Sequence, residues 1–216
     1  RICHRNYVNI HPMNEINTFY LFPTPVWKIN ILEELKKQNL SIKNIINECL
    51  KIKSEDKGRS ISNQGKHAYQ SNNLDFLKYK NTNLNQLMKT INNISQTIYG
   101  TTWKGKINLS DTWLNVNGPN SFNVFHNHPK GILSGCVYLE VPKDSGCLIM
   151  GKGQTDLFLY ATYGDVKQHS EFTFETVSFE PKVGDVFIFP SHVEHSVGKN
   201  KSKKNRISLA FNYLKE

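Results

Sequence analysis

Three histidines are the residues of this chain whose type and spacing suggest metal chemistry. His126 and His128 are separated by a single residue, and in an extended strand alternate side chains share a face. Two imidazoles on one face can hold one metal ion. A third ligand would complete a facial set that leaves positions free on a metal such as iron, and His195 is the predicted third ligand.

A second alternating segment begins at Arg206. The alternation predicts that Arg206 and Ser208 lie on one face, with Ile207 and Leu209 on the other. A guanidinium group grips a carboxylate with two parallel hydrogen bonds, and the serine hydroxyl adds a third. We therefore expect the polar face to bind a small dicarboxylate, while the apolar face belongs to the core.

The order His126-x-His128, then His195, then Arg206-x-Ser208 resembles the iron(II)/2-oxoglutarate-dependent oxygenases. It is most similar to a branch of that superfamily found in marine bacteria and phages, and the similarity covers roughly residues 20 to 214. The landmarks of the branch in this sequence are Leu21–Trp27 (LFPTPVW), Leu133–Leu139 (LSGCVYL) and Phe189–Ser191 (FPS).

The resemblance implies a dioxygenase that uses Fe(II) as its metal and 2-oxoglutarate as its cosubstrate. Such an enzyme releases succinate and carbon dioxide and usually hydroxylates its substrate, and nothing in the sequence identifies that substrate. The implied metal ligands are the three histidines, and Arg206 with Ser208 would bind the cosubstrate. These four residues, His126, His128, His195 and Arg206, are the predicted catalytic set.

Two further residues are candidates for the cosubstrate pocket. Tyr138 lies on the polar face of its strand, so its hydroxyl would point into a barrel and could bind a carboxylate; the alternative is a core tyrosine. Asn115, on an earlier strand, is placed similarly and can both donate and accept hydrogen bonds. For Trp113, in the same strand, packing is the favoured role.

His128 departs from the wider superfamily, which carries a carboxylate at this position. A neutral imidazole does not offset the charge of iron, so a site with three histidines should be more electropositive. Halogenating relatives place a small residue here, but histidine is bulky and is itself a ligand type. We favour His128 as a ligand over a role in contacting the substrate or supporting the other ligands.

Other functions share these residues. An iron dioxygenase with three histidines that acts on thiols without 2-oxoglutarate would use Arg206 for its substrate. A cupin-like binding module without catalysis would bind no metal. A lone histidine on a strand is more often an ordinary core or surface residue than a ligand, so the metal hypothesis depends on the combination of residues.

Composition and charge set wider limits. The chain has 216 residues, 38% of them hydrophobic, a net charge of +9 and a pI near 9.3, so its surface should attract anions, with nucleic acid a compatible partner for which no motif is present. The dense lysine run at 199–204 is typical of a solvated hairpin loop. No apolar run is long enough to cross a bilayer. We expect a cytoplasmic protein, in the host cytoplasm if it is viral, for which a homodimer is compatible.

The four cysteines, Cys3, Cys49, Cys136 and Cys147, lack the spacing of a metal or disulfide motif, which predicts free thiols. Residues 1–17 show no periodicity and are expected to be a poorly ordered leader or extension, which keeps His4 and His11 out of the site. Residues 18–216 are expected to form a single oxygenase domain, with a helical cover at about 31–100 and a barrel at about 105–214.

Hydrophobic periodicity predicts the fold. Helical spacing covers 31–53, with Ser41 as a cap between two helices, and 84–99, ending at Gly100; residues 54–74 are expected to be a long loop near the substrate entrance. The segment 19–29, interrupted by two prolines, is an expected edge strand. The remaining expected strands are 108–117, 121–128, 131–141, 146–150, 157–161, 171–180, 185–190, 194–197 and 205–214. This succession is typical of a mainly β protein with N-terminal helices, a double-stranded β-helix of the jelly-roll, cupin-like type.

Overall fold

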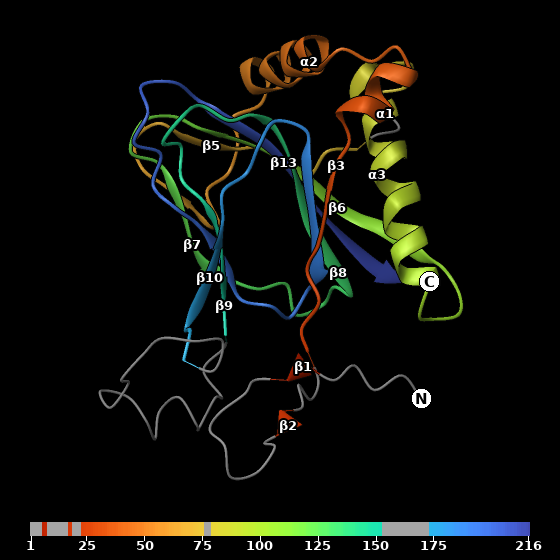
Figure 1. The fold of residues 1–216 in the computed structure, drawn as a ribbon. Coiled ribbons are helices and arrows are strands. Elements are labelled where there is room, and N and C mark those ends of the chain that lie inside the picture. The colour runs from red at the N-terminus through yellow and green to blue at the C-terminus, as the bar shows by residue number, and fades with distance from the viewer. Residues whose placement is uncertain (1–5, 8–16, 19–22, 76–78, 153–172) are drawn as a thin grey trace.

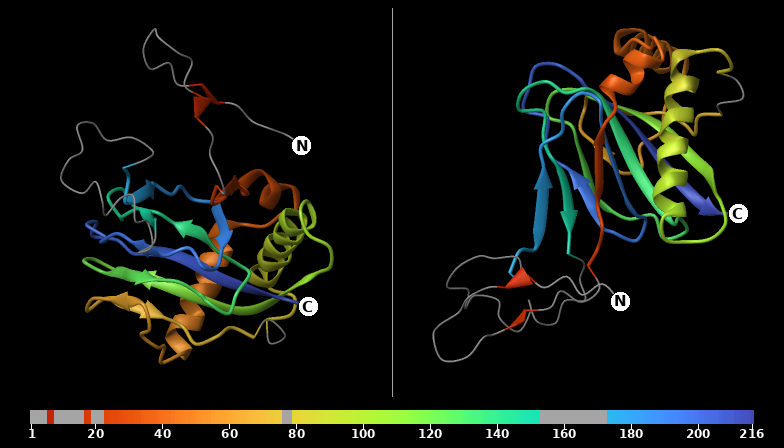
Figure 2. Two further views of the ribbon diagram at one scale, coloured as in Figure 1. Left: turned by 90° about the horizontal axis from the view of Figure 1, so that it is seen from below. Right: turned by 45° about the vertical axis from the view of Figure 1, so that its right-hand side comes forward.

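The computed structural model describes residues 6–7, 17–18, 23–75, 79–152 and 173–216. Besides a small two-stranded pair, they form two antiparallel sheets backed by helices on one side (Figures 1 and 2). The predicted strand at 157–161 and the predicted leader, apart from two short pairing strands β1 (Asn6–Tyr7) and β2 (Asn17–Thr18), lie outside the described residues. None of the described helices is long and apolar enough to cross a membrane.

The larger sheet has six strands in the order β3-β11-β8-β13-β6-β5. Their bounds are β3 Trp27–Asn30, β11 Asp185–Pro190, β8 Leu133–Glu140, β13 Arg206–Lys215, β6 Ile107–Asn117 and β5 Ala68–Gln70. The predicted edge strand thus does lie at an edge of the sheet. The prolines just before it are tolerated there, because proline has no backbone N–H to donate to a neighbouring strand.

The smaller sheet has five strands in the order β10-β9-β12-β7-β4. Their bounds are β10 Thr176–Phe179, β9 Leu148–Gly151, β12 His195–Val197, β7 Phe122–His126 and β4 Asn63–Gln64. The two sheets face one another, and side chains from both fill the space between them, among them Leu148, Met150, Phe187 and Phe189. This is the predicted jelly roll.

Three helices cover the outer face of the six-stranded sheet (Figures 1 and 2). They are α1 Leu32–Lys37, α2 Ile42–Glu55 and α3 Asn83–Gly100. Ser41 occupies the N-cap position of α2, although its side chain makes no capping hydrogen bond. The start of α3 is capped twice, because Thr82 accepts from the amide of Asn85 and Glu48 of α2 accepts from the amide of Leu84.

Strand alternation explains how the helices and the larger sheet share a core. Along β13, Ile207, Leu209 and Phe211 point outward and are almost fully buried against the helices. Val116 on β6 and Val137 on β8 lie in the same core. The opposite face of these strands is turned to the smaller sheet, so the pattern predicted for the segment after Arg206 is confirmed.

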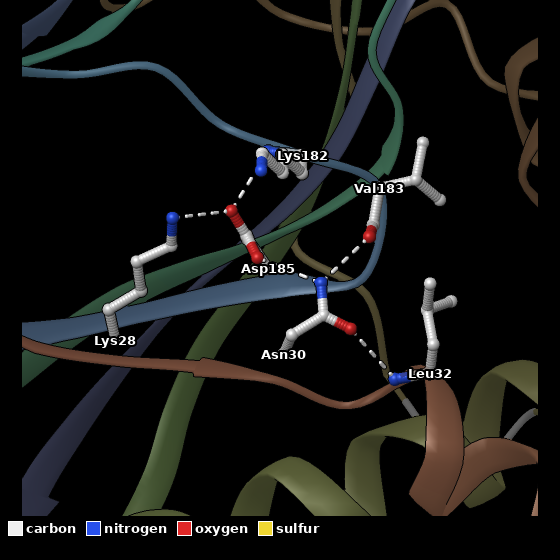
Figure 3. Close-up of polar contacts among 6 residues, drawn as sticks. All are labelled: Lys28, Asn30, Leu32, Lys182, Val183 and Asp185. Carbon is white, nitrogen blue, oxygen red and sulfur yellow. Dashed lines mark hydrogen bonds and ion pairs between the residues drawn. The ribbon is translucent and has the colours of Figure 1, made fainter.

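A buried carboxylate fixes the edge strand β3 to β11 (Figure 3). Asp185 follows the Gly184 turn and accepts hydrogen bonds from the Asn30 side chain at 2.8 Å and the Lys182 amide at 2.8 Å, and it forms a 2.9 Å ion pair with Lys28. Burial by itself would raise the pKa of Asp185, but these donors outweigh it and hold the pKa below its usual value.

The expectation of a long loop at 54–74 is wrong. The segment contributes β4 to the smaller sheet and β5 to the larger one, and it therefore closes one side of the space between them. The segment has few apolar residues, so its sequence shows no hydrophobic pattern that would predict strands. Its side chains form local hydrogen bonds instead: Asp56 accepts from Asn72 and from the hydroxyl of Tyr69. The lysine run at 199–204 does form the loop between β12 and β13.

Candidate metal and cosubstrate site

The three histidines come from neighbouring strands of the smaller sheet. His126 is the last residue of β7, His195 is the first residue of β12, and the two are direct partners in the antiparallel register. His128 lies two residues beyond the end of β7, so it reaches the same place from the following turn instead of from the strand itself. Its amide is fixed by a hydrogen bond to the carbonyl of Ser191.

The imidazole rings converge. The ring centroids of His126 and His195 are 4.3 Å apart, those of His126 and His128 are 5.1 Å apart, and those of His128 and His195 are 5.2 Å apart. Their ligand atoms all lie within 4.8 Å of one another, which is close enough for one cation. Imidazole nitrogen suits iron among other transition metals, so the donor set fits the group that the sequence implies.

The protonation of the rings also suits a metal. The Nδ1 atoms of His126 and His195 lie 2.8 Å and 2.9 Å from the carbonyls of Val124 and Val193, which can only accept, so each Nδ1 carries the proton and each Nε2 keeps a free lone pair. Burial lowers the pKa of all three imidazoles. Burial together with the neighbouring His126 lowers the pKa of His128 to about 4, and burial with His126 and His128 lowers that of His195 to about 3. All three are neutral at pH 7.

Arg206 is buried at the beginning of β13, with 2% of its surface exposed. Its Nη1 donates to the carbonyls of Ser145 and Gly198, whereas its Nη2 has no hydrogen-bond partner. A turn at Gly146 makes room for it: Gly146 has a φ of +91°, and a Cβ there would collide with the Gly198 carbonyl. A buried guanidinium with one unsatisfied nitrogen is costly unless an anion binds it.

The register of the larger sheet aligns the other predicted cosubstrate residues. Ser208 is the direct partner of Asn115 on one side and of Tyr138 on the other. All three line one pocket together with Arg206 and the metal-site histidines. Tyr138 and Asn115 are buried, the Oδ1 of Asn115 is unpartnered, and burial raises the pKa of Tyr138 well above its usual value, so its hydroxyl stays a donor.

The pocket also contains residues that the sequence did not single out. Ser62 and Asn123 line it, and Asn123 donates to Ser62 at 3.3 Å while accepting from Asn117 at 2.8 Å. Asn123 was missed because a register shift between His195 and Val197 places it on the same side as His126, three positions away, which simple alternation does not allow. Trp113, expected to pack, is buried and also lines the pocket.

A family model described as "Putative 2OG-Fe(II) oxygenase" matches residues 111–212, the span that holds all three histidines and Arg206. In its residues 111–212, just under half of its length, the chain matches the 2-oxoglutarate/iron(II) oxygenase superfamily. As an iron(II)- and 2-oxoglutarate-dependent dioxygenase, it has Fe(II) as its metal and 2-oxoglutarate as its cosubstrate. A comparison with curated proteins gives no match.

Solved structures share the fold of this oxygenase at low sequence identity. A Pseudomonas putida prolyl-4-hydroxylase aligns with a TM-score of 0.59 and 15% identity over 89% of this chain and 94% of that one. The 2-oxoglutarate-dependent epimerase SnoN from nogalamycin biosynthesis gives 0.62 and 13% over 89% and 77%. The viral collagen prolyl hydroxylase of Paramecium bursaria Chlorella virus-1 gives 0.54 and 13% over 88% and 96%.

Proposed function

We propose that His126, His128 and His195 together hold Fe(II), that Arg206 binds the distal carboxylate of 2-oxoglutarate, and that the enzyme hydroxylates a small organic substrate. The observation that carries this proposal is the pairing of a converged set of three neutral imidazoles with a buried, half-satisfied guanidinium in one pocket. Arg206 does not stabilise the folded protein by itself, because its Nη2 is buried without a hydrogen-bond partner.

Each histidine would present its Nε2 to the metal. The backbone carbonyls that accept from His126 and His195 hold the two rings in that orientation before the metal arrives. His128 takes the position of the carboxylate in the wider superfamily, so the first ligand sphere is neutral and the full charge of the ion acts on anionic ligands. When bound, iron(II) and 2-oxoglutarate supply dioxygen activation, with succinate and carbon dioxide as products of the cosubstrate.

The cosubstrate would extend from the histidines toward Arg206. The free Nη2 of Arg206 and the hydroxyls of Ser208 and Tyr138 can all donate to one carboxylate, and the region excludes water because all three residues are buried. Asn115, the cross-strand partner of Ser208, lies on the same wall and would orient the middle of the cosubstrate. The protein residues thus bind and position the reactants and keep the site dry.

The role of Arg206 is tested by comparing two keto acids that differ in the distal carboxylate. Under anaerobic conditions the wild-type protein with Fe(II) should give a visible charge-transfer band on titration with 2-oxoglutarate, and should bind 2-oxobutyrate, which lacks that carboxylate, far more weakly. Arg206→Ala should weaken the affinity for 2-oxoglutarate at least about 30-fold, since truncating one member of a buried charge pair costs about 2–5 kcal/mol. It should leave the affinity for 2-oxobutyrate nearly unchanged.

Lys204→Ala is the matched control, because Lys204 is an exposed cation two residues before Arg206, in the loop that leads into β13. Its keto acid affinities should equal those of the wild type. Arg206→Lys, which keeps the charge without the fork, checks that a loss is not simply misfolding, and should bind 2-oxoglutarate with intermediate affinity. A wild-type protein that takes up oxygen without 2-oxoglutarate, or an Arg206→Ala variant with normal discrimination between the two acids, would refute the proposal.

A further inference from the structure

Arg59 lies in the same cross-strand row as the residues assigned to the cosubstrate. It forms a β-bridge with Gln70, which is the direct partner of Asn115, and Asn115 is the partner of Ser208. Residues that are directly opposite in antiparallel strands have side chains on the same face. The side chain of Arg59 is therefore on the inner face of the larger sheet, at the edge farthest from Tyr138.

An aromatic ring joins Arg59 to the metal site. The guanidinium carbon of Arg59 lies 5.8 Å from the centre of the Trp113 ring, and the Trp113 ring lies 5.6 Å from the ring of His128. Trp113 is 6% exposed and lines the pocket. The guanidinium thus lies over the face of a ring that also contacts a proposed metal ligand, so one aromatic side chain separates a positive charge from the candidate metal site.

Hydrogen bonds hold Arg59 in place, but no described acidic residue pairs with its charge. Its amide donates to the Gln70 carbonyl at 2.7 Å and its Nε donates to the Ser71 carbonyl at 3.0 Å, so the backbone and the near end of the guanidinium are fixed. Its two Nη groups have no hydrogen bond or ion pair among the described residues. By contrast, Lys28 at the opposite edge of the sheet, over the ring of Phe187, is already paired with Asp185.

The presence of arginine, and not lysine, at position 59 supports a role in binding an anion. The described part of the chain is rich in lysine but contains only two arginines, Arg59 and Arg206, and both lie on this inner face. A guanidinium differs from an ammonium group in presenting a planar fork that matches a carboxylate. In Arg59 the two free Nη groups form that fork, and its half-buried position leaves it open to solvent on one side.

We propose that Arg59 binds a carboxylate of the primary substrate, so that the enzyme acts on small carboxylic acids held between Arg59 and the metal along the face of Trp113. This inference rests on the proposed function. A phosphate-bearing substrate is disfavoured, because Asp111 lies on the same face of β6 two residues from Trp113, and its negative charge reaches His128. One guanidinium beside a carboxylate suits a monoanion better than a dianion.

The test uses the iron-loaded protein with saturating 2-oxoglutarate and a panel of probes. The panel consists of the twenty common L-amino acids, their N-acetyl derivatives and simple mono- and dicarboxylic acids, each paired with its carboxamide. Succinate release above the background without a probe is the readout. We expect at least one free acid to stimulate succinate release at least about ten times more than its amide. Arg59→Met should remove that preference by raising the KM for the acid at least about ten-fold.

Arg59→Met keeps the aliphatic stem over Trp113 and removes only the charge, and Arg59→Lys should show an intermediate KM. Lys57→Gln, which removes an exposed cation from the same segment, is the control that should match the wild type. The 2-oxoglutarate band is measured for every variant. If the band forms normally but acids and amides stimulate equally, or no acid stimulates, or Arg59→Met keeps the preference, the inference is wrong while the proposed function stands. Absence of the band in the wild type would instead overturn the proposed function.

Discussion

The two sheets of this protein divide their work unequally. The six-stranded sheet has its outer face under three helices, and its strands supply half of the buried residues in the core that they share with those helices. Among the described residues no helix covers the five-stranded sheet (Figure 2), and apolar side chains such as Val124 and Phe125 of β7 are 39% and 50% exposed. Yet the smaller sheet carries His126 and His195.

This division shows how the proposed metal ligands and Arg206 can be buried at a free-energy cost without unfolding the protein. Three neutral imidazoles and a half-satisfied arginine are unfavourable to bury, and the free energy that offsets them comes from apolar area elsewhere. The larger sheet supplies it, since residues on its outer face share a buried core with the helices. Substitutions in the two sheets should therefore separate catalysis from stability.

The largest expected effect is loss of turnover in His195→Ala. Replacing residues that merely orient metal ligands costs about 10- to 100-fold, so removal of a ligand should lower succinate release at least about 100-fold. The free energy of unfolding of the metal-free protein should fall little or even rise, because the variant no longer buries an imidazole. Iron content after anaerobic loading and succinate release are the measurements.

His192→Ala is the matched control for this loss. His192 is an exposed histidine three residues away in the same connection, outside the converged set. It should load iron and turn over 2-oxoglutarate like the wild type. Equal iron content in the His195→Ala and wild-type proteins would show that the three imidazoles do not share a metal.

The converse substitution is Leu209→Ala in β13. Leu209 is fully buried in the core beneath the helices, so the variant should lose about 2–5 kcal/mol of unfolding free energy in urea titrations. Its inner-face neighbours Ser208 and Ala210 are unchanged, and at temperatures where it is folded its affinity for 2-oxoglutarate should stay within about two-fold of the wild type. Leu214→Ala, at a position 39% exposed on the same strand, should cost less than about 0.5 kcal/mol. A selective loss of cosubstrate affinity in Leu209→Ala would contradict the division between the sheets.

The sequence predicted two central strands of the larger sheet, β8 and β13, well because apolar and polar residues alternate along them. In β13 and β8, one face is apolar and the other polar, and both faces lie where the alternation placed them. The helices at 31–53 and 84–99 followed from apolar spacing in the same way. The strands β4 and β5 were missed because their pairing partners are far along the chain and their own residues carry no alternation.

The site was predictable only in part, because some of its residues are brought in by long-range strand pairing. The histidines and Arg206 stand in recognisable spacing, and the structure brings them into one pocket with Ser208, Tyr138 and Asn115. Arg59 has no such spacing, since its place beside Trp113 depends on an isolated β-bridge to Gln70. Long-range pairing of this kind leaves no periodic pattern in the sequence.

The smallest effect we expect concerns Asp185 and its contacts with Lys28 and Asn30, at the edge of the larger sheet (Figure 3). Asp185→Asn removes the negative charge that pairs with Lys28 and that accepts a hydrogen bond from the side-chain amide of Asn30. At pH 7 the substitution should therefore lower the free energy of unfolding by about 1–2 kcal/mol. The value is near the low end for bonds to charged groups because the Lys28 side chain is 42% exposed and partly screened by solvent. The measurement is urea unfolding from pH 8 to pH 2.5.

The pH dependence of the unfolding free energy distinguishes the loss of the Asp185 charge from a loss of side-chain packing. Because the folded state holds the pKa of Asp185 below the ordinary value of 3.8, the carboxylate contributes stability fully above about pH 4, and that contribution disappears as the pH falls through the folded pKa. The difference between wild type and Asp185→Asn should therefore be constant near neutrality and shrink toward zero below pH 3.8. Glu33→Gln, which breaks the exposed pair with Lys36, should change nothing at any pH. A difference for Asp185→Asn that persists at pH 2.5 would mean that packing of the side chain, and not its charge, joins β3 to β11, since a protonated aspartate and an asparagine then differ only in shape and donors.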